Sequence, residues 1–433
     1  MKKNRNLREQ LPLFPTEGVA NAPKSDETDK RVKLVSFREL VPEITDTGYL
    51  THAIFYYPAK FIPHVVKYAL MSFTKEGNWV VDPFAGSGTV GVEAYICKRN
   101  AFLLDLNPLL NYMIPLKVYT EKERLSEYSL SQILDGLGDS THRFVPVWSN
   151  VAYWYPPEVL EVLSGYWGFI KNGEHNTYSS IIESALLKVS KHFSYAEHKA
   201  PKLFKSKSKL KYIEELLRDN WKKQLKEMVY SCSLETLRNI NNFATLTHHH
   251  KNSVAFEGGV DSSYYSHDRE FDALITSPPY LQAQEYIRTA KMDLFWLGYS
   301  EAQMRQLARL EIPYRKPRRV IQTPTLEKIR AELTRQDLIQ LLDSYFSHTI
   351  NALENSMDQL KAKATACIFV GNPLIDGIKV EIWRILMEYF TDKGYRFETV
   401  YEDRIKSRQL FRSRNNKNPE GMKSEFLLIL RKE

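Results

Sequence analysis

The stretch Asp82-Pro83-Phe84-Ala85-Gly86-Ser87-Gly88-Thr89 closes a short apolar run that begins at Trp79, and a helical pattern follows over residues 89–97. Glycines at such a place let the backbone approach a ligand closely, and the first turn of the helix supplies free N–H groups. A second apolar run, residues 101–104, ends at Asp105. Strand, glycine turn, helix and strand form a βαβ unit, so we expect a parallel sheet covered by helices.

The glycine turn fits two kinds of cofactor. Gly86, Gly88 and Gly91 satisfy the dinucleotide fingerprint, and Asp105 lies near the distance expected of an acid that binds ribose, which implies an NAD-dependent oxidoreductase. That fingerprint has its first glycine directly after the strand, however, and Asp82 would place a carboxylate beside a pyrophosphate. The sulfonium and ammonium groups of S-adenosylmethionine suit this acid better, so the pattern favours a cationic cofactor. A purely structural turn would leave the two acids unexplained.

A second turn, Ser277-Pro278-Pro279-Tyr280, follows an apolar run at residues 271–276. Two prolines cannot continue a central strand, so the chain turns at the carboxyl edge of the sheet, where open α/β sheets bind ligands. The Ser277 side chain and the Pro278 carbonyl can accept hydrogen bonds from a planar amino group, and Tyr280 can stack on the ring that carries it. The turn therefore indicates a site for a base.

These motifs resemble those of the amino-methylating DNA methyltransferases of restriction–modification systems. The glycine turn resembles the cofactor loop of that family, and residues 277–280 resemble its catalytic motif. Tyr57-Pro58-Ala59-Lys60-Phe61-Ile62-Pro63 is similar to the segment that closes over the methionine part of the cofactor. Leu104-Asp105-Leu106-Asn107-Pro108 looks like the acidic second-strand motif, with Asp105 expected on the ribose hydroxyls. Asp261 is our candidate for the acid that contacts the adenine ring.

The resemblance implies an α/β, Rossmann-like sheet of the S-adenosylmethionine-dependent methyltransferases, with an inserted helical subdomain. The residues expected to bind the cofactor are Tyr57, Pro58, Lys60, Phe61, Asp82, Pro83, Phe84, Gly86, Gly88, Thr89, Asp105, Asn107 and Asp261, and those expected to catalyse are Ser277, Pro278, Pro279 and Tyr280. No metal is expected, because the adjacent side chains of His248-His249-His250 diverge. Double-stranded DNA is the expected substrate, and a cognate restriction endonuclease is a candidate partner.

The motifs and composition divide the chain into segments. We expect a polar N-terminal arm at residues 1–48, the cofactor-binding half of the methyltransferase domain at 49–119, a helical insertion at 120–250 and the catalytic half at 251–433. Residues 199–226 of the insertion hold ten Lys and Arg against three acids, a net charge of +7 in a chain of net charge +8. A second basic cluster spans residues 309–319. Both are candidates for contact with DNA phosphates, and the alternative for each is a solvated surface.

The cysteines and the absence of targeting signals narrow the choice of reaction and of cellular location. Cys97, Cys232 and Cys367 are scattered and have no proline neighbour, which argues against the cysteine nucleophile of C5-cytosine methylation and against a disulfide scaffold. Neither a signal peptide nor a membrane-length apolar stretch is visible, so we expect a soluble, cytoplasmic protein without a membrane partner.

The base that receives the methyl group is suggested by Ser277. Members of the resembled family with serine at this position mostly modify cytosine N4, whereas those with Asp or Asn mostly modify adenine N6. The sequence thus predicts a site-specific cytosine-N4 DNA methyltransferase, with adenine-N6 methylation as the alternative. An RNA base methyltransferase or a catalytically idle DNA-binding module remain further hypotheses; the former usually starts this turn with Asp or Asn and carries an RNA-binding appendage.

Overall fold

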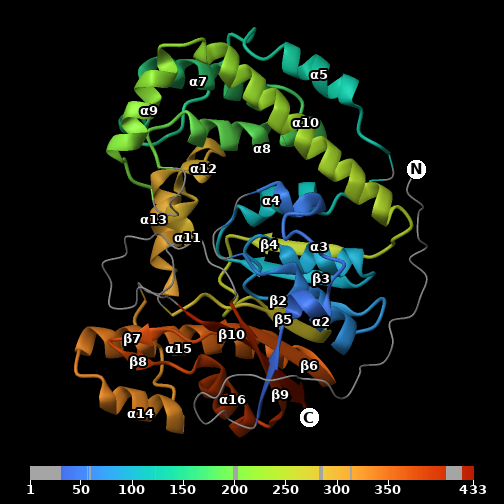
Figure 1. The fold of residues 1–433 in the computed structure, drawn as a ribbon, viewed down its shortest axis with the longest axis vertical. Coiled ribbons are helices and arrows are strands. Elements are labelled where there is room, and N and C mark those ends of the chain that lie inside the picture. The colour runs from blue at the N-terminus through green and yellow to red at the C-terminus, as the bar shows by residue number, and fades with distance from the viewer. Residues whose placement is uncertain are drawn as a thin grey trace.

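The computed structural model describes residues 31–55, 57, 60–121, 123–197, 203–281, 286–312, 315–405 and 422–433. In this part of the chain the main sheet has the strand order β1-β9-β10-β6-β5-β2-β3-β4 (Figure 1). Its strands are β1 (Val32–Val35), β2 (Trp79–Asp82), β3 (Asn100–Asp105), β4 (Val254–Gly258), β5 (Phe271–Thr276), β6 (Leu360–Gly371), β9 (Tyr395–Arg404) and β10 (Ser424–Lys432). All neighbouring pairs are parallel except those that β10 makes with β6 and β9. A short hairpin is formed by β7 (Leu374–Ile375) and β8 (Ile378–Lys379).

Successive side chains of each strand point to opposite faces of the sheet, and helices bury both faces. On β2, Val80 packs with one hydrophobic cluster and Val81 with the other. One face is covered by α1 (Phe37–Leu40), α2 (Pro63–Phe73), α3 (Thr89–Ile96) and α4 (Leu110–Lys117), and the other by α14 (Pro324–Glu332), α15 (Gln336–Asp358) and α16 (Ile382–Asp392). The mostly parallel sheet between helices confirms the expected α/β, Rossmann-like fold.

Part of the segment expected as a loose N-terminal arm is instead ordered on the sheet. β1 pairs in parallel with residues 400–403 of β9, and Phe37 is fully buried against Tyr68. Residues 32–40 of the expected arm therefore pack on the sheet, and residues 1–30 lie outside the described residues. The sequence hides this pairing because the partner strand lies near the other end of the chain.

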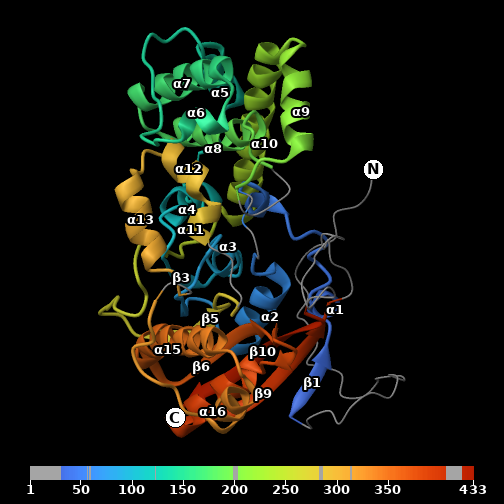
Figure 2. The same ribbon diagram turned by 90° about the vertical axis from the view of Figure 1, so that its left-hand side faces the viewer.

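A separate layer of helices stands beyond α4 and the β4 edge of the sheet (Figures 1 and 2). It contains α5 (Glu127–Asp135), α6 (Val151–Trp154), α7 (Pro157–Asn172), α8 (Thr177–His192), α9 (Lys207–Leu217) and α10 (Trp221–Thr247), and the short helix η1 (Leu50–Ala53) lies against α10. The layer has its own hydrophobic core, which is distinct from the two cores that sandwich the sheet. Helices therefore fill most of the connection between β3 and β4.

Three helices that follow the second turn, α11 (Tyr286–Thr289), α12 (Lys291–Trp296) and α13 (Glu301–Arg309), join the core of this helical layer. Trp296 stacks on Trp167 with ring centroids 5.4 Å apart, and its indole N–H donates to the Tyr155 hydroxyl at 2.8 Å. The boundary expected at residue 250 therefore does not separate the two layers. The apolar side chains of these three helices pack against aromatic rings such as Trp167 of α7 and Tyr155. No local sequence pattern reveals this packing.

Candidate active site

The glycine turn between β2 and α3 needs both of its glycines. Gly86 and Gly88 have φ angles of +52° and +74°, a backbone region that side chains rarely adopt. A Cβ at Gly86 would lie 3.2 Å from the Tyr57 ring, and one at Gly88 would lie 2.1 Å from the Cδ1 atom of Ile114. The turn is thus packed closely on one side by a helix and on the other by an aromatic ring.

Side chains from β3 and α4 fix the backbone of this turn. The Asp105 carboxylate accepts hydrogen bonds from the backbone N–H groups of Gly86 and Asn107, each at 2.7 Å. The fully buried Lys117 donates from Nζ to the Ser87 carbonyl at 2.7 Å. Burial raises the pKa of Asp105 to about 6 and lowers that of Lys117 well below its usual range. Sequence analysis missed Lys117, because a lysine at the end of an ordinary helix carries no signal.

Asp82 connects the two turns rather than facing the pocket. Its carboxylate is 1% exposed and accepts from the Thr276 hydroxyl at 2.6 Å and from the Phe84 N–H at 3.0 Å. Burial raises the pKa of Asp82 to about 7, although both hydrogen bonds oppose the shift. Because Thr276 directly precedes Ser277, this acid links the end of β2 to the start of the serine–proline turn. The expected contact between this carboxylate and a cationic cofactor stays a prediction.

One pocket of about 1010 Å³, partly open to solvent, lies at the carboxyl edge of the sheet between the two turns. Of the expected site residues, its walls contain Tyr57, Lys60, Phe61, Pro83, Phe84, Gly86, Asp105, Asn107, Asp261, Ser277 and Pro279. Asp82, Gly88, Thr89, Pro278 and Tyr280 do not line it, and Pro58 lies outside the described residues. Residues that sequence reasoning missed also form its walls, among them Ser87, Tyr286, Glu311, Arg315 and His348. The structure thus brings the two motifs to a common cavity.

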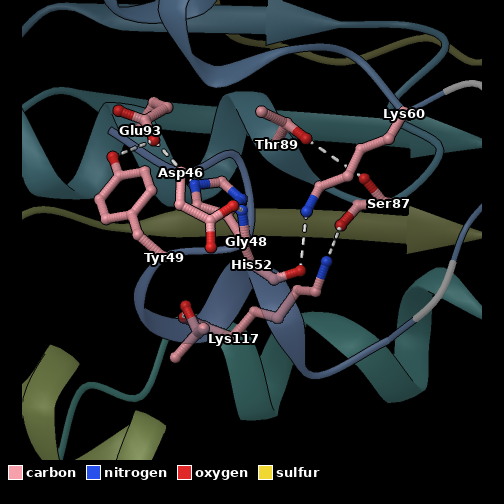
Figure 3. A network of polar contacts seen from close by, with 10 residues as sticks. Asp46, Gly48, Tyr49, His52, Lys60, Ser87, Thr89, Glu93 and Lys117 are labelled. Atoms are coloured by element: carbon pink, nitrogen blue, oxygen red, sulfur yellow. Dashed lines mark hydrogen bonds and ion pairs between the residues drawn. The ribbon is translucent and has the colours of Figure 1, made fainter. Parts of the chain in front are cut away.

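A buried polar network supports the wall that carries Lys60 (Figure 3). The Lys60 ammonium donates to the His52 carbonyl at 2.7 Å, and the His52 ring lies 2.7 Å from the Glu93 carboxylate. Tyr49 donates its hydroxyl to the same carboxylate at 2.5 Å. Burial lowers the pKa of Lys60 to about 8 and that of His52 to about 4, although Glu93 opposes both shifts. At neutral pH the pocket wall therefore presents the Lys60 cation, while His52 is uncharged.

Asp261 lines the pocket in a pair with an arginine. Its carboxylate accepts from the Arg315 guanidinium at 2.7 Å and from the Ser263 N–H at 3.1 Å, and the Arg318 guanidinium lies 3.8 Å away. Burial works against ionisation of Asp261, but the hydrogen bond and charge of Arg315 outweigh it, so the pKa is lowered. Arg315 is only 10% exposed. This member of the second basic cluster therefore points inward and is not available to a DNA phosphate.

The serine–proline turn follows β5, and only part of it reaches the pocket. Ser277 and Pro279 line the wall, whereas Pro278 is buried. The Tyr280 hydroxyl donates to the Glu425 carboxylate of β10 instead of reaching the pocket. Tyr286, which stacks with Tyr57 at a ring separation of 6.1 Å, is the aromatic residue that lines the wall after the turn. Stacking of Tyr280 on a base stays a prediction.

The basic run of the insertion contains both exposed and buried lysines. Lys209 is 3% exposed and donates to the His192 carbonyl at 2.7 Å, so it cannot contact a phosphate without leaving the fold. Lys205 lies 3.6 Å from the centre of the Tyr153 ring. Lys207 and Lys222 are exposed and remain candidates for DNA contact. Across the described ranges, no group of His, Cys, Asp or Glu side chains is arranged to hold a metal, and no helix is long and apolar enough to span a bilayer.

Comparison with known proteins gives matches to one kind of enzyme. Residues 6–113, which include the glycine turn, match the N6/N4 methyltransferase model described as DNA methylase. The type II methyltransferase M.MvaI of Kocuria varians is 23% identical over 428 residues, which covers 89% of this chain and 92% of that protein. M.BsoBI of Geobacillus stearothermophilus is 23% identical over 302 residues, covering 64% of this chain and 58% of that protein. M.MjaII of Methanocaldococcus jannaschii shares 39% identity over 57 residues, covering 13% of this chain and 11% of that protein.

These matches confirm the resemblance first seen in the two turns, and the fold places both turns on one pocket as methyl transfer to an amino group requires. The chain is therefore similar to the N6/N4-type DNA methylases over its glycine turn and to type II DNA methyltransferases over most of its length.

Proposed function

We propose that this chain transfers a methyl group from S-adenosylmethionine to the N4 amino group of a cytosine in double-stranded DNA. The methylation would protect a short recognition site from a cognate restriction endonuclease. The observation that carries the proposal is the shared pocket: Ser277 and Pro279 line the same cavity as Gly86 and Asp105. One wall can therefore hold the methyl donor while another holds the amino group that receives it.

The residues of the pocket fit this cofactor. The pocket is partly open to solvent and is lined by both turns, so a cofactor at one wall and an extruded base at the other would both be within reach. Asp105 lies at the wall, where it would accept from ribose hydroxyls, and the Lys60 ammonium would pair with the carboxylate of the methionine part. Phe84 and Tyr57 supply apolar and aromatic surface. When bound, S-adenosylmethionine supplies a methyl group activated by its sulfonium charge.

The serine–proline turn would hold and orient the amino group. An exocyclic amino nitrogen is a poor nucleophile, because its lone pair is delocalised into the ring of the base. The Ser277 hydroxyl and the Pro278 carbonyl would accept the amino hydrogens and favour a more tetrahedral nitrogen, which then attacks the methyl carbon in line and gives up one proton. Pro279 contributes no competing N–H. The rate gain arises from positioning and electrostatics, without a covalent bond to the enzyme.

A cysteine-based route to C5-methylcytosine finds no support in the pocket. None of the three cysteines is a wall residue. Cys97 and Cys367 are buried, and burial raises the pKa of Cys97 to about 12 and that of Cys367 further still. A thiol with so high a pKa stays protonated at neutral pH and is a weak nucleophile.

Mass spectrometry of nucleosides tests the proposal directly. DNA from cells that express the chain should contain N4-methylcytosine, and DNA from cells that express a Tyr280→Ala variant should not. N6-methyladenine in place of N4-methylcytosine would overturn the cytosine assignment and keep the mechanism. Neither product, from a chain shown by calorimetry to bind the cofactor, would refute methyl transfer to DNA bases.

Protection from a restriction endonuclease can be tested separately from methyl transfer. Sequencing that detects modified bases should place the methyl groups at one position of a short repeated motif. Purified DNA carrying the modification should then resist a nuclease that cuts that motif. Methylation scattered without a motif would contradict a role in restriction–modification while leaving the chemistry intact.

A further inference from the structure

The tyrosine that ends the serine–proline turn is tied to a strand two positions away in the sheet. The Tyr280 hydroxyl donates to the Glu425 carboxylate near the start of β10, and β6 lies between β5 and β10. Glu425 is in register with Gly371, the last residue of β6. A Cβ at Gly371 would lie 3.7 Å from the Cζ atom of Tyr280, an ordinary contact distance, so the tyrosine side chain lies next to the end of β6.

The two ends of the turn are therefore anchored to different strands. At its start, Thr276 donates to Asp82 of β2 at 2.6 Å. At its end, Tyr280 donates to Glu425 of β10. Between these anchors lie Ser277 and Pro279, both at the pocket wall, on a backbone that two prolines make rigid. A rigid segment held at both ends has its position set by those ends, so a lost anchor moves the whole turn.

We propose that Glu425 is a positioning residue for methyl transfer, which acts through Tyr280 to hold the serine–proline turn at the pocket. The inference rests on the methyl transfer proposed above. Burial and the neighbouring Glu425 carboxylate hold the pKa of Tyr280 well above its usual range, so the hydroxyl keeps its proton and remains a donor. A hydrogen bond from a neutral hydroxyl to a carboxylate is stronger than one between two neutral groups.

The test compares variants of both partners in the full chain. Single-turnover methylation of unmethylated bacterial genomic DNA is measured with radiolabelled S-adenosylmethionine, and the affinity for that cofactor is measured by calorimetry. Glu425→Ala should slow methyl transfer by roughly 100-fold, the order expected from a misplacement of about 1 Å, while cofactor affinity changes little. Glu425→Gln keeps an acceptor oxygen and should recover most of the rate.

A double-mutant comparison separates positioning from general damage to β10. Tyr280→Phe removes the donor, so adding Glu425→Ala to it should cause no further loss of rate. Ser424→Ala is the matched control: it removes the 2.5 Å bond from Ser424 to Glu402 at the same strand end and should leave the rate unchanged.

Three results would overturn the inference: a normal rate in Glu425→Ala, losses that multiply in the double variant, or an equal loss in Ser424→Ala. Absence of any methylation by the parent chain refutes the proposed function itself, whereas a parent chain that methylates beside an equally active Glu425→Ala variant refutes only the role of Glu425.

Discussion

Replacement of Asp105 by alanine should weaken cofactor binding and destabilise the fold together, because one carboxylate serves both. Its two oxygens accept from the N–H groups of Gly86 and Asn107 at 2.7 Å, and it also lines the pocket. Each charge-assisted hydrogen bond contributes about 1.5–3 kcal/mol, but removal of the carboxylate also removes the free-energy cost of burying its charge. We therefore expect a net loss of about 2 kcal/mol in the free energy of unfolding.

The loss of affinity follows from the ribose contact that Asp105 would make. Without a charged acceptor for the hydroxyls, the dissociation constant for S-adenosylmethionine should rise by about 10–100-fold. Asp105→Asn keeps one acceptor oxygen and removes the buried charge, so it should show a smaller loss of affinity and little loss of stability. Calorimetric titration gives the affinity, and urea denaturation without ligand gives the stability.

A carboxylate at the opposite edge of the sheet provides the matched control. Asp272, at the start of β5, accepts from the Trp79 N–H at 2.9 Å and from the Lys361 ammonium at 2.6 Å. Asp272→Ala should lower stability without changing cofactor affinity. If Asp105→Ala lost stability and yet bound the cofactor normally, the carboxylate would be only structural. Unchanged stability and affinity would refute the hydrogen-bonding argument altogether.

Three further predictions concern other charged groups. Burial raises the pKa of Asp82 from its ordinary value of 3.8 to about 7, so the stability that its protonated form contributes at low pH is lost as pH rises from about 4 to about 7. Asp82→Asn should therefore gain about 2 kcal/mol relative to the parent across that interval in urea denaturation. Lys117→Met should lower cofactor affinity about 10-fold, because it releases the Ser87 carbonyl, and should change the melting temperature little, because it also removes a buried amine. A large fall in melting temperature at normal cofactor affinity would contradict this prediction. Charge reversal at Lys207 and Lys222 should weaken DNA binding and reduce the slope of its salt dependence by about two, and an unaltered slope would return both lysines to the solvated surface.

Local chemistry in the sequence was enough to predict the two turns and the fold around them. Gly86 and Gly88 are required where the backbone adopts positive φ angles, and two successive prolines end a strand wherever they occur. Both constraints act within a few residues, so they can be recognised from the sequence without a structure. The βαβ pattern between Trp79 and Asp105 likewise depends on neighbours in sequence, which is why the parallel sheet could be predicted.

Tertiary structure alone decided which side chains work together. Lys117 holds the glycine turn, Glu425 holds Tyr280, and Asp261 is paired with Arg315, yet no spacing in the sequence relates the members of these pairs. Such contacts depend on where helices and strands from distant segments come to lie.

Burial was equally hidden in the sequence. Lys209 stands in a basic run that reads as a surface, but packing against α8 encloses it. Trp296 follows the serine–proline turn in the chain, but the rings of Trp167 and Tyr155 place it in the helical layer. Whether a charged or aromatic side chain faces solvent, a ligand or a core is settled by the free energy of packing the whole chain, and no local stretch contains that information.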